Sequence, residues 1–281
     1  MKYSQKDMLN ILNTYNFKFK KKYGQNFIID VNIINNIVNK SEIDNSTLVI
    51  EIGPGAGSLT YKLVNKAKFV LCYEIDKSVD KILKSNLSSY NNYKIIYDDF
   101  LKRNIQDDIK NYKYDKLYVV ANLPYYITTP IITKIVENKI DVNKMIIMVQ
   151  KEVGERFKAT SGKDYNSLSI YLNYYFNISK IMDVSRNVFM PKPNVDSIVI
   201  SLEKKAVKLN VKDEKLFFKL VRDSFRQKRK MLKNNLKMYN LEVINKVLHK
   251  NGYNLNNRAE QIPANIFVEI ANELYNSQKC A

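Results

Sequence analysis

The chain has 281 residues, of which 45% are hydrophobic, so it is long enough for one large globular domain and a small one. Lys and Arg total 46 against 28 Asp and Glu, and the resulting net charge of +18 favours a polyanionic partner, above all a nucleic acid. A single histidine and two distant cysteines, Cys72 and Cys280, exclude a conventional zinc site and a disulfide framework.

Nothing in the sequence predicts a membrane protein. No apolar run approaches the ~18 residues of a membrane span, and the first residues lack the apolar core of a signal peptide. We therefore expect a cytoplasmic protein with no membrane and no metal partner.

From about residue 47 the sequence alternates apolar runs with helical patterns. Strands are predicted over residues 47–51, 69–74, 93–97, 116–121 and 145–149. Helices are predicted over residues 58–65 and 77–85, and another begins near Pro130. This alternation is typical of right-handed βαβ units, so the predicted fold class is α/β with a mostly parallel sheet. Two later apolar runs, residues 178–184 and 198–202, are expected to add strands at one edge.

The pattern changes after residue 203. Apolar residues recur at spacings of four or seven between Phe217 and Leu236, which predicts helix, and residues 265–276 are predicted to form a last helix. The other face of the first pattern is basic and holds Arg226, Lys228, Arg229, Lys230 and Lys233. We predict an α/β domain over residues 1–203 and a small helical domain over residues 204–281.

Charge is unevenly divided between these predicted domains. Residues 204–281 hold 17 basic and 7 acidic side chains, whereas residues 1–203 hold 29 and 21, so the net charges are +10 and +8. A general drift toward lysine and asparagine is the alternative explanation for the basic composition, but drift alone would spread the excess more evenly. We therefore expect the helical domain to bind a polyanion, with a nucleic acid favoured.

A glycine turn, Gly53-Pro54-Gly55-Ala56-Gly57, follows the first predicted strand and opens a helix. Glu74 ends the second strand, where a carboxylate can hold both ribose hydroxyls of a nucleoside, and Asp99 follows the third, where it can accept from an adenine amine. Ser58 stands where the dinucleotide fingerprint requires glycine or alanine, and Pro54 lacks an N–H for a pyrophosphate. S-adenosylmethionine therefore fits better than a nicotinamide dinucleotide, and a tight turn without a ligand is the alternative.

The tetrapeptide Asn122-Leu123-Pro124-Tyr125 ends the fourth predicted strand, where ligands bind in open α/β sheets. The side-chain carbonyl of Asn122 and the backbone carbonyl of Leu123 can accept the two N–H groups of an exocyclic amine, which favours a localised lone pair on its nitrogen. Pro124 stiffens the turn, and Tyr125 can stack on the base. These residue types predict alkylation of a nucleobase amine, which requires no histidine because the alkylated amine can lose its proton to water.

A base inside a helix cannot reach such a pocket, so the target must be single-stranded or flipped out. Phe189, before Met190-Pro191, can offer a second ring to the base, although a packed phenylalanine in a rigid loop explains it equally well. A basic cluster that includes Lys20, Lys21 and Lys22 precedes Gly24, and solvated lysines are the simplest explanation for it.

Five segments in order resemble one known family, the ribosomal RNA adenine N6,N6-dimethyltransferases. They are Lys22-Tyr23-Gly24-Gln25-Asn26-Phe27, the run from Glu51 to Gly57, Asn122-Leu123-Pro124-Tyr125, Gln150-Lys151-Glu152-Val153, and the run from Phe189 to Ser197. The resemblance extends from about residue 18 to the end. The Gly-Pro-Gly turn, residues 150–169 and residues 225–232 look like the branch that modifies small-subunit rRNA. Tyr23 departs from the usual leucine, and Asn166 stands where a glycine is common.

The resemblance implies a Rossmann-like methyltransferase domain, with residues 1–46 closing over the cofactor, followed by a small helical domain. The cofactor contacts would fall on Asn26, Ile28, Gly53, Glu74, Asp99 and Asn122, together with Gly55 of the turn. The catalytic group would comprise Asn122, Leu123, Pro124, Tyr125 and Phe189. Lys20, Lys21 and Lys22 would then lie at the pocket mouth and contact RNA, as would the basic residues between 226 and 233.

We therefore predict an S-adenosylmethionine-dependent enzyme that dimethylates two adjacent adenosines in the 3′-terminal hairpin loop of small-subunit rRNA, late in subunit assembly and as a monomer. The first alternative is a large-subunit rRNA dimethyltransferase that confers macrolide-type resistance. An assembly factor that binds rRNA with little catalysis and a DNA adenine methyltransferase are further alternatives. The particle that accepts methyl groups distinguishes the two rRNA enzymes, and turnover distinguishes an enzyme from the assembly factor.

Overall fold

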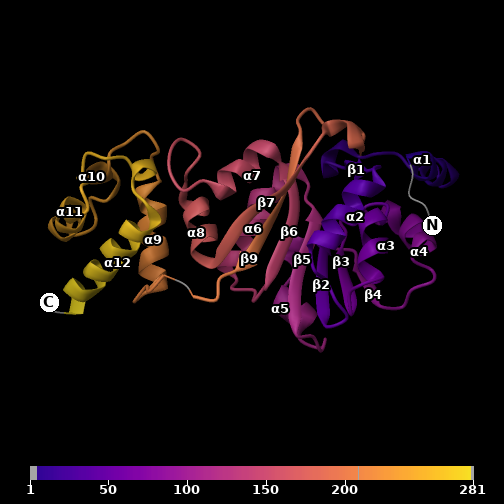
Figure 1. The fold of residues 1–281 in the computed structure, drawn as a ribbon, viewed down its shortest axis with the longest axis horizontal. Coiled ribbons are helices and arrows are strands. Elements are labelled where there is room, and N and C mark those ends of the chain that lie inside the picture. The colour runs from indigo at the N-terminus through magenta and orange to yellow at the C-terminus, as the bar shows by residue number, and fades with distance from the viewer. Residues whose placement is uncertain (1–4, 208, 280–281) are drawn as a thin grey trace. The chain divides into compact units, whose positions relative to one another are not determined.

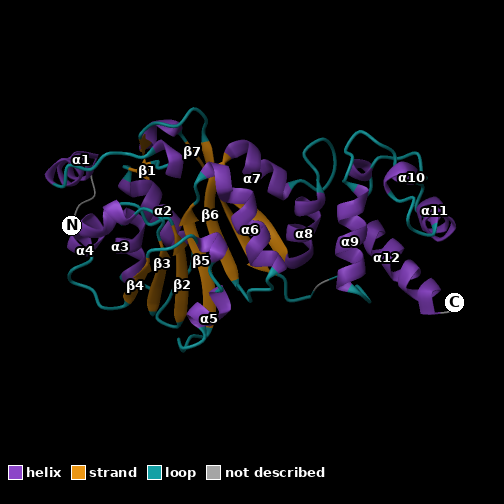
Figure 2. Ribbon diagram, turned by 180° about the vertical axis from the view of Figure 1, so that it is seen from behind, coloured by secondary structure: helices purple, strands orange, loops and turns teal. Residues whose placement is uncertain are grey.

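Seven strands form one sheet, in the spatial order β4–β3–β2–β5–β6–β9–β7 (Figure 1), and Figure 2 shows the same sheet from behind. The computed structural model describes residues 5–207 and 209–279 (Figure 1). In chain order the strands of this sheet are β2 (Thr47–Ile52), β3 (Phe69–Tyr73), β4 (Tyr93–Ile96), β5 (Lys116–Asn122), β6 (Lys144–Gln150), β7 (Phe176–Val184) and β9 (Ser197–Lys204). Neighbours from β4 to β6 pair in parallel, and β9 pairs antiparallel with β6. The predicted α/β class and the two late edge strands are confirmed.

Helices join the parallel strands, as the alternating pattern predicts. In chain order the α-helices are α1 (Gln5–Thr14), α2 (Val31–Lys40), α3 (Ser58–Val64), α4 (Asp80–Asn86), α5 (Ile105–Ile109), α6 (Thr128–Glu137), α7 (Lys151–Lys158), α8 (Ser167–Tyr175), α9 (Glu214–Ser224), α10 (Leu232–Asn235), α11 (Leu241–Lys250) and α12 (Ala264–Lys279). Short 3-10 turns are η1 (Lys21–Tyr23), η2 (Lys77–Val79), η3 (Phe100–Lys102), η4 (Tyr125–Ile127), η5 (Arg186–Val188) and η6 (Ala259–Gln261).

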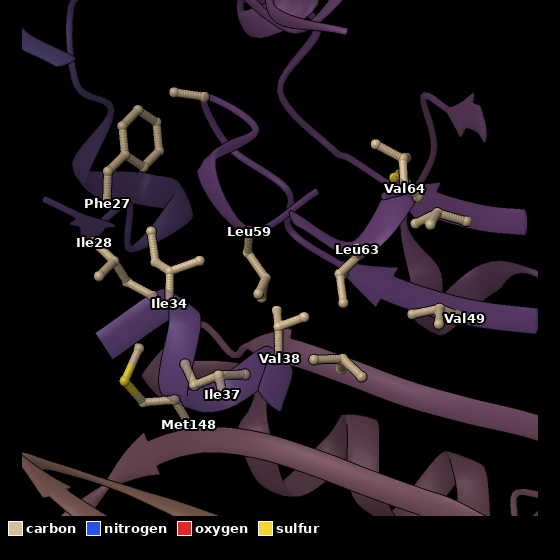
Figure 3. Close-up of a cluster of buried hydrophobic side chains, with 14 of the residues drawn as sticks. Phe27, Ile28, Ile34, Ile37, Val38, Val49, Leu59, Leu63, Val64 and Met148 are labelled. Carbon is tan, nitrogen blue, oxygen red and sulfur yellow. The ribbon is translucent and has the colours of Figure 1, made fainter. Parts of the chain in front are cut away.

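The central strands are apolar along their length because helices cover both of their faces. Every residue of β2 is buried, as are the five central residues of β5. Helix α2 turns one apolar stripe, Ile34, Ile37 and Val38, toward this core. Figure 3 shows that stripe beside Leu63 of α3 and Val49 of β2.

A second, two-stranded sheet ties the N-terminal segment to a distant loop. Its strands are β1 (Phe27–Ile28) and β8 (Phe189–Met190), which run antiparallel. Ile28 lies opposite Phe189, and all but Met190 of these four residues are buried. The N-terminal segment is thereby fixed to the loop that precedes β9.

The chain divides into two compact units. The first contains the described residues up to Gly154 together with Ser179–Lys204, and the second contains Glu155–Ile178 with the described residues from Lys205 onward. The break after residue 204 lies beside the predicted boundary, but the 155–178 segment groups with the C-terminal helices. Its aromatic side chains explain why, since the Tyr171 hydroxyl donates to the Phe218 carbonyl at 2.7 Å and the two rings pack edge to face at 4.8 Å.

The basic residues from Arg226 to Lys230 lie in a loop. The sequence pattern predicted instead that they would lie on one face of a long helix. Helix α9 ends at Ser224, turns and bends follow to residue 230, and α10 begins only at Leu232. The Asn235 side chain holds this break in place, because its amide donates to the carbonyls of Ser224 at 2.7 Å and Gln227 at 3.2 Å. Leu232 and Leu236 are nevertheless buried, so the apolar residues reach the core from two short elements.

Candidate active site

A pocket opens at the carboxyl ends of β2, β3 and β5. The strand order reverses there, because β3 and β4 lie on one side of β2 and β5 lies on the other, and such a reversal leaves a crevice for ligands. All of the residues predicted to bind the cofactor line this pocket, as do Leu123, Pro124 and Tyr125. The cofactor set comprises Asn26, Ile28, Gly53, Gly55, Glu74, Asp99 and Asn122.

The glycine turn forms the floor of the pocket between β2 and α3. Gly55 has φ +56°, a left-handed conformation that an L side chain adopts only with strain. A Cβ added there would lie 2.6 Å from the ring of Phe27, so the absence of a side chain also lets the N-terminal segment approach. The Gly55 N–H donates to the Glu74 carboxylate at 3.1 Å, which links the turn to the end of β3.

Glu74 presents a buried carboxylate, 5% exposed, next to this turn. One of its oxygens accepts the Gly55 N–H, and the other accepts the Asp76 N–H at 2.8 Å. Burial raises the pKa of Glu74 above its usual value, although these two hydrogen bonds oppose the rise. Each carboxylate oxygen has a second lone pair, so the pair of oxygens can still accept from two hydroxyls of a ligand.

Asp99 lies on the same side of the pocket, after β4. Its carboxylate caps η3 by accepting the Leu101 N–H at 2.9 Å. Asp98 and Phe100 also line the pocket here, so an acidic and an aromatic side chain stand side by side. This combination suits a purine that carries an exocyclic amine.

Glu51, in β2, is a pocket residue that the sequence analysis did not single out. Its side chain is 1% exposed, and the Cys72 thiol donates to it at 3.7 Å. Burial raises the pKa of Glu51 to about 8, so the acid is largely protonated at neutral pH. The sequence signal that could have identified Glu51 is a glutamate inside an otherwise apolar strand. Cys72 is free and buried, and Cys280 lies outside the described residues.

The tetrapeptide begins at Asn122, the last residue of β5, and hydrogen bonds hold its first two residues in place. The Asn122 side-chain N–H₂ donates to the Asn26 carbonyl at 2.8 Å, which leaves the Asn122 side-chain oxygen as the acceptor end of the amide. Leu123 is buried, and its N–H donates to the Met148 carbonyl of β6 at 3.1 Å. The Asn122 side-chain oxygen and the Leu123 backbone carbonyl are therefore two acceptors on one rigid turn.

Tyr125 follows at the start of η4, with its ring among the pocket residues. Its hydroxyl lies 2.6 Å from the Ser197 hydroxyl of β9, and this hydrogen bond fixes the orientation of the ring. Burial raises the pKa of Tyr125, which keeps the phenol neutral at physiological pH. Tyr126, next along the chain, also lines the pocket and is 55% exposed; the sequence analysis did not identify it.

Within the predicted catalytic group, Phe189 is the member that does not line the pocket. It is 3% exposed and packs in the hydrophobic cluster that includes Ile28 and Val184. This arrangement matches the alternative interpretation of Phe189 as a packed ring, and it offers no open face to a base.

The three N-terminal lysines differ in their surroundings. Lys21 and Lys22 are exposed, and the Lys22 ammonium lies 4.7 Å from the centre of the Tyr23 ring. The Lys20 ammonium is instead bound by the Asp76 carboxylate at 2.6 Å. Tyr23 and Gly24, which directly follow this cluster in the chain, line the pocket.

The remaining predicted RNA contacts belong to the second unit and are all exposed. They are Arg226, Lys228, Arg229, Lys230 and Lys233. Lys228 donates to the Lys163 carbonyl, which joins the loop to the residues before α8. A compact group of cations on one loop can bind consecutive phosphates of a nucleic acid.

Neither a metal site nor a membrane helix is found within residues 5–207 and 209–279. No group of three or more His, Cys, Asp or Glu side chains there is arranged to hold a metal ion. No helix in the same ranges is long and apolar enough to cross a membrane.

The chain matches the model of one protein family, Ribosomal RNA adenine dimethylase, over residues 16–276. It is also similar to the Ribosomal RNA small subunit methyltransferase A of Staphylococcus aureus strain bovine RF122 / ET3-1. The two are 46% identical over 276 residues, which cover 95% of this chain and 93% of that protein. The same protein from strain JH9 is 46% identical over 273 residues, or 94% of this chain and 92% of its own length.

Two solved structures share the fold. A dimethyladenosine transferase from Plasmodium falciparum superposes with a TM-score of 0.72 at 26% identity, covering 89% of this chain and 97% of its own. The 23S rRNA methyltransferase ErmE superposes with a TM-score of 0.70 at 22% identity, covering 89% and 99%. At that identity the second likeness concerns the fold alone.

Proposed function

Because the chain belongs to the ribosomal RNA adenine dimethylase family, we propose that it methylates N6 of two adjacent adenosines in the 3′-terminal hairpin loop of small-subunit rRNA. S-adenosylmethionine is the proposed methyl donor. The observation that carries the proposal is the shared pocket, in which Glu74 and the glycine turn meet Asn122 and Tyr125. One side of it suits a nucleoside cofactor and the other suits a flat base with an amine.

The lining of the pocket fits this cofactor better than one with a pyrophosphate. Among the described residues no lysine or arginine lines the pocket, and Pro54 has no N–H to offer a phosphate. Glu74, Asp98 and Asp99 instead give the lining an acidic character, which suits a cationic ligand. Glu74 would accept from the ribose hydroxyls, Asp99 from the adenine amine, and Gly53, Asn26 and Ile28 would bind the amino-acid end.

The bound donor supplies a methyl group that its positive sulfur already activates. The protein's task is therefore to position the target nitrogen and to make its lone pair available. The Asn122 side-chain oxygen and the Leu123 carbonyl accept the two N–H groups of the adenine amine, which draws the lone pair out of conjugation with the ring. Tyr125 stacks on the base, and its bond to Ser197 fixes the plane in which the amine lies.

No base with a raised affinity for protons is required. The alkylated amine is acidic and releases one of its two protons to water, which leaves one N–H to be accepted by Asn122 or Leu123. This agrees with a pocket whose lining contains no histidine among the described residues.

The RNA must deliver an unstacked adenosine, because the acceptors lie below the pocket mouth. Exposed lysines at the mouth, Lys21 and Lys22, and the basic loop of the second unit support a substrate of considerable size. We propose that this substrate is a pre-assembled small subunit, modified late in its assembly, in the cytoplasm and by a monomeric enzyme.

Methyl transfer from labelled S-adenosylmethionine tests this function. Small subunits and large subunits from a strain that lacks the modification are supplied separately, and the labelled nucleotides are mapped. Label on two adjacent adenosines of the small-subunit hairpin supports the proposal. Label only in the large subunit would assign the resistance-type activity, and binding without turnover would assign an assembly factor.

A further inference from the structure

The N-terminal segment from Lys20 to Ile28, here called the strap, contacts both halves of the proposed active site. The Phe27 ring packs against Gly55 of the cofactor turn, where no side chain could fit. One residue earlier, the Asn26 carbonyl accepts from the Asn122 amide of the target tetrapeptide. Holding the strap in place therefore positions groups on both sides of the pocket at once.

Asp76 fixes the start of the strap. Its side chain is 2% exposed, and its two oxygens accept from the Lys20 ammonium at 2.6 Å and from the Gln25 amide at 2.7 Å. The Gln25 side-chain oxygen accepts the Lys20 N–H at 2.8 Å, which closes a ring of three hydrogen-bonded residues. The Asp76 N–H in turn donates to Glu74, the proposed ribose ligand.

The surroundings of Asp76 explain why this ring needs a cation. Burial raises the pKa of Asp76, but hydrogen bonds from Lys20, Ser78 and Gln25 outweigh it and hold the pKa below its usual value. A buried ionised carboxylate is costly unless it is paired. The Lys20 ammonium, which also donates to the Ser78 hydroxyl at 2.9 Å, provides that pairing and is not free for a phosphate.

We propose that Lys20, Gln25 and Asp76 form a clasp that holds the strap closed over the methyl-donor site, so that Lys20 is a positioning residue for cofactor binding rather than an RNA contact. This inference rests on the proposed use of S-adenosylmethionine. It divides the N-terminal lysines into two groups, since Lys21 and Lys22 keep their exposed positions at the mouth.

The affinity for S-adenosylhomocysteine, the form of the donor that remains after methyl transfer, tests the clasp without any RNA. Lys20→Met is expected to raise its dissociation constant about fivefold, because the ammonium's hydrogen bonds to Asp76 and Ser78 are lost and a smaller fraction of the protein has a closed strap. Lys20→Arg should restore most of the affinity. With saturating cofactor the strap is closed by mass action, so KM for the cofactor should rise while kcat changes less than twofold.

Salt dependence provides the matched control. Lys22→Met should leave cofactor affinity unchanged and lower the log–log salt slope of rRNA-fragment binding by about one, whereas Lys20→Met should leave that slope unchanged. The opposite assignment, with a lower slope and normal cofactor affinity for Lys20→Met, would overturn the clasp. Gln25→Leu is used together with Asp76→Asn as a second test of the clasp. Asp76→Asn alone would not isolate the clasp, because Asp76 also caps η2 through the Ser78 N–H.

Hydrogen exchange separates failure of the clasp from failure of the proposed function. Lys20→Met should speed exchange of the amides from Lys21 to Ile28 at least threefold, with those of β5 unchanged, whether or not the protein methylates rRNA. Equal exchange in both proteins would refute the clasp even if methyl transfer were observed. Faster strap exchange in a protein without methyl transfer would keep the clasp and refute the proposed activity.

Discussion

The side-chain amide of Asn122 donates a 2.8 Å hydrogen bond to the backbone carbonyl of Asn26, which lies 96 residues earlier in the chain. This bond assigns the two ends of the Asn122 amide, because the nitrogen is committed to the N-terminal segment and the oxygen remains an acceptor. A residue at the end of a strand thus obtains its orientation from a segment that crosses the pocket. In the proposed mechanism, Asn122 therefore links the position of the acceptor oxygen to the position of the N-terminal segment.

Replacement of Asn122 separates these two roles. Asn122→Ala removes the acceptor, and methyl transfer into small subunits should fall by about two orders of magnitude, as for loss of one preorganised polar group in other active sites. Asn122→Asp keeps acceptor oxygens but replaces the donating amide nitrogen with a carboxylate oxygen, which repels the Asn26 carbonyl. The N-terminal segment is then held less firmly, so cofactor affinity should fall as well. Asn143→Ala is the control, because Asn143 bonds the Leu117 N–H at the other end of β5. Full activity of Asn122→Ala would refute the proposed mechanism.

Gly55 should tolerate no side chain. Gly55→Ala places a Cβ 2.6 Å from the Phe27 ring and also forces an L residue to φ +56°, so it should weaken both folding and cofactor binding. Gly162→Ala is matched in conformation, with φ +81°, but has no heavy atom within 4 Å of the added Cβ. The conformational cost common to both is about 1–2 kcal/mol. Urea unfolding and cofactor titration should show a clear excess loss for Gly55→Ala, and equal losses would contradict the contact with Phe27.

The buried acid Glu51 should make the folded protein less stable as the pH rises. Its folded pKa of about 8 lies above the unfolded value of 4.5, so between these values the folded state binds more protons. This contribution to stability is complete below pH 4.5 and is lost as the pH rises toward 8, by at most about 1.4 kcal/mol per pH unit. Glu51→Gln stays neutral and should flatten the slope. The chain has one histidine, so few other side chains titrate in this window.

Urea unfolding at pH 5.5, 6.5 and 7.5 measures that slope. Burial also raises the pKa of Glu74, so any contribution of Glu74 to the slope has the same sign as that of Glu51. Asp44→Asn is the control, since hydrogen bonds from Lys116, Ser46 and Thr47 lower the pKa of Asp44 and move its titration below this range. Parallel pH profiles for wild type and Glu51→Gln would show that Glu51 is not protonated in the folded state.

Neutralising the basic loop should weaken rRNA binding and make that binding less dependent on salt concentration. Arg229→Gln and Lys230→Gln should each lower the log–log slope by about one if each side chain contacts a phosphate, with cofactor affinity unchanged. Lys250→Gln is the control in the same unit, because Lys250 is exposed but paired with Glu269 at 2.7 Å. A slope that is the same in all variants would remove this loop from the RNA-binding surface.

The sheet and the pocket were predictable because their signals are local. Apolar runs such as residues 116–121 and the glycine turn identify strand ends without reference to the rest of the chain. The carboxyl ends of parallel strands meet at one edge of the sheet, so Glu74, Asp99 and Asn122 were expected to converge before any contact was known.

The features that the sequence analysis missed depend on contacts between distant residues. The pairing of Asp76 with Lys20 joins residues 56 positions apart, and Tyr171 bonds Phe218 across 47 positions, so neither leaves a periodic pattern. The expected helix through residue 225 failed for a related reason, since Asn235 binds carbonyls that a longer helix would use itself. Phe189 has the residue type of a stacking partner, but its pairing in β8 buries it.

The acidic lining of the pocket has a consequence for turnover in the proposed reaction. Methyl transfer removes the positive charge of the donor sulfur, so the spent product is neutral at the atom where the fresh donor is cationic. Glu74, Asp98 and Asp99 then attract the fresh donor more strongly than the product, which favours exchange after each transfer. Adding two methyl groups to each of two adenosines requires repeated exchange on one RNA, and a pocket that discriminates by charge favours release of the spent molecule each time.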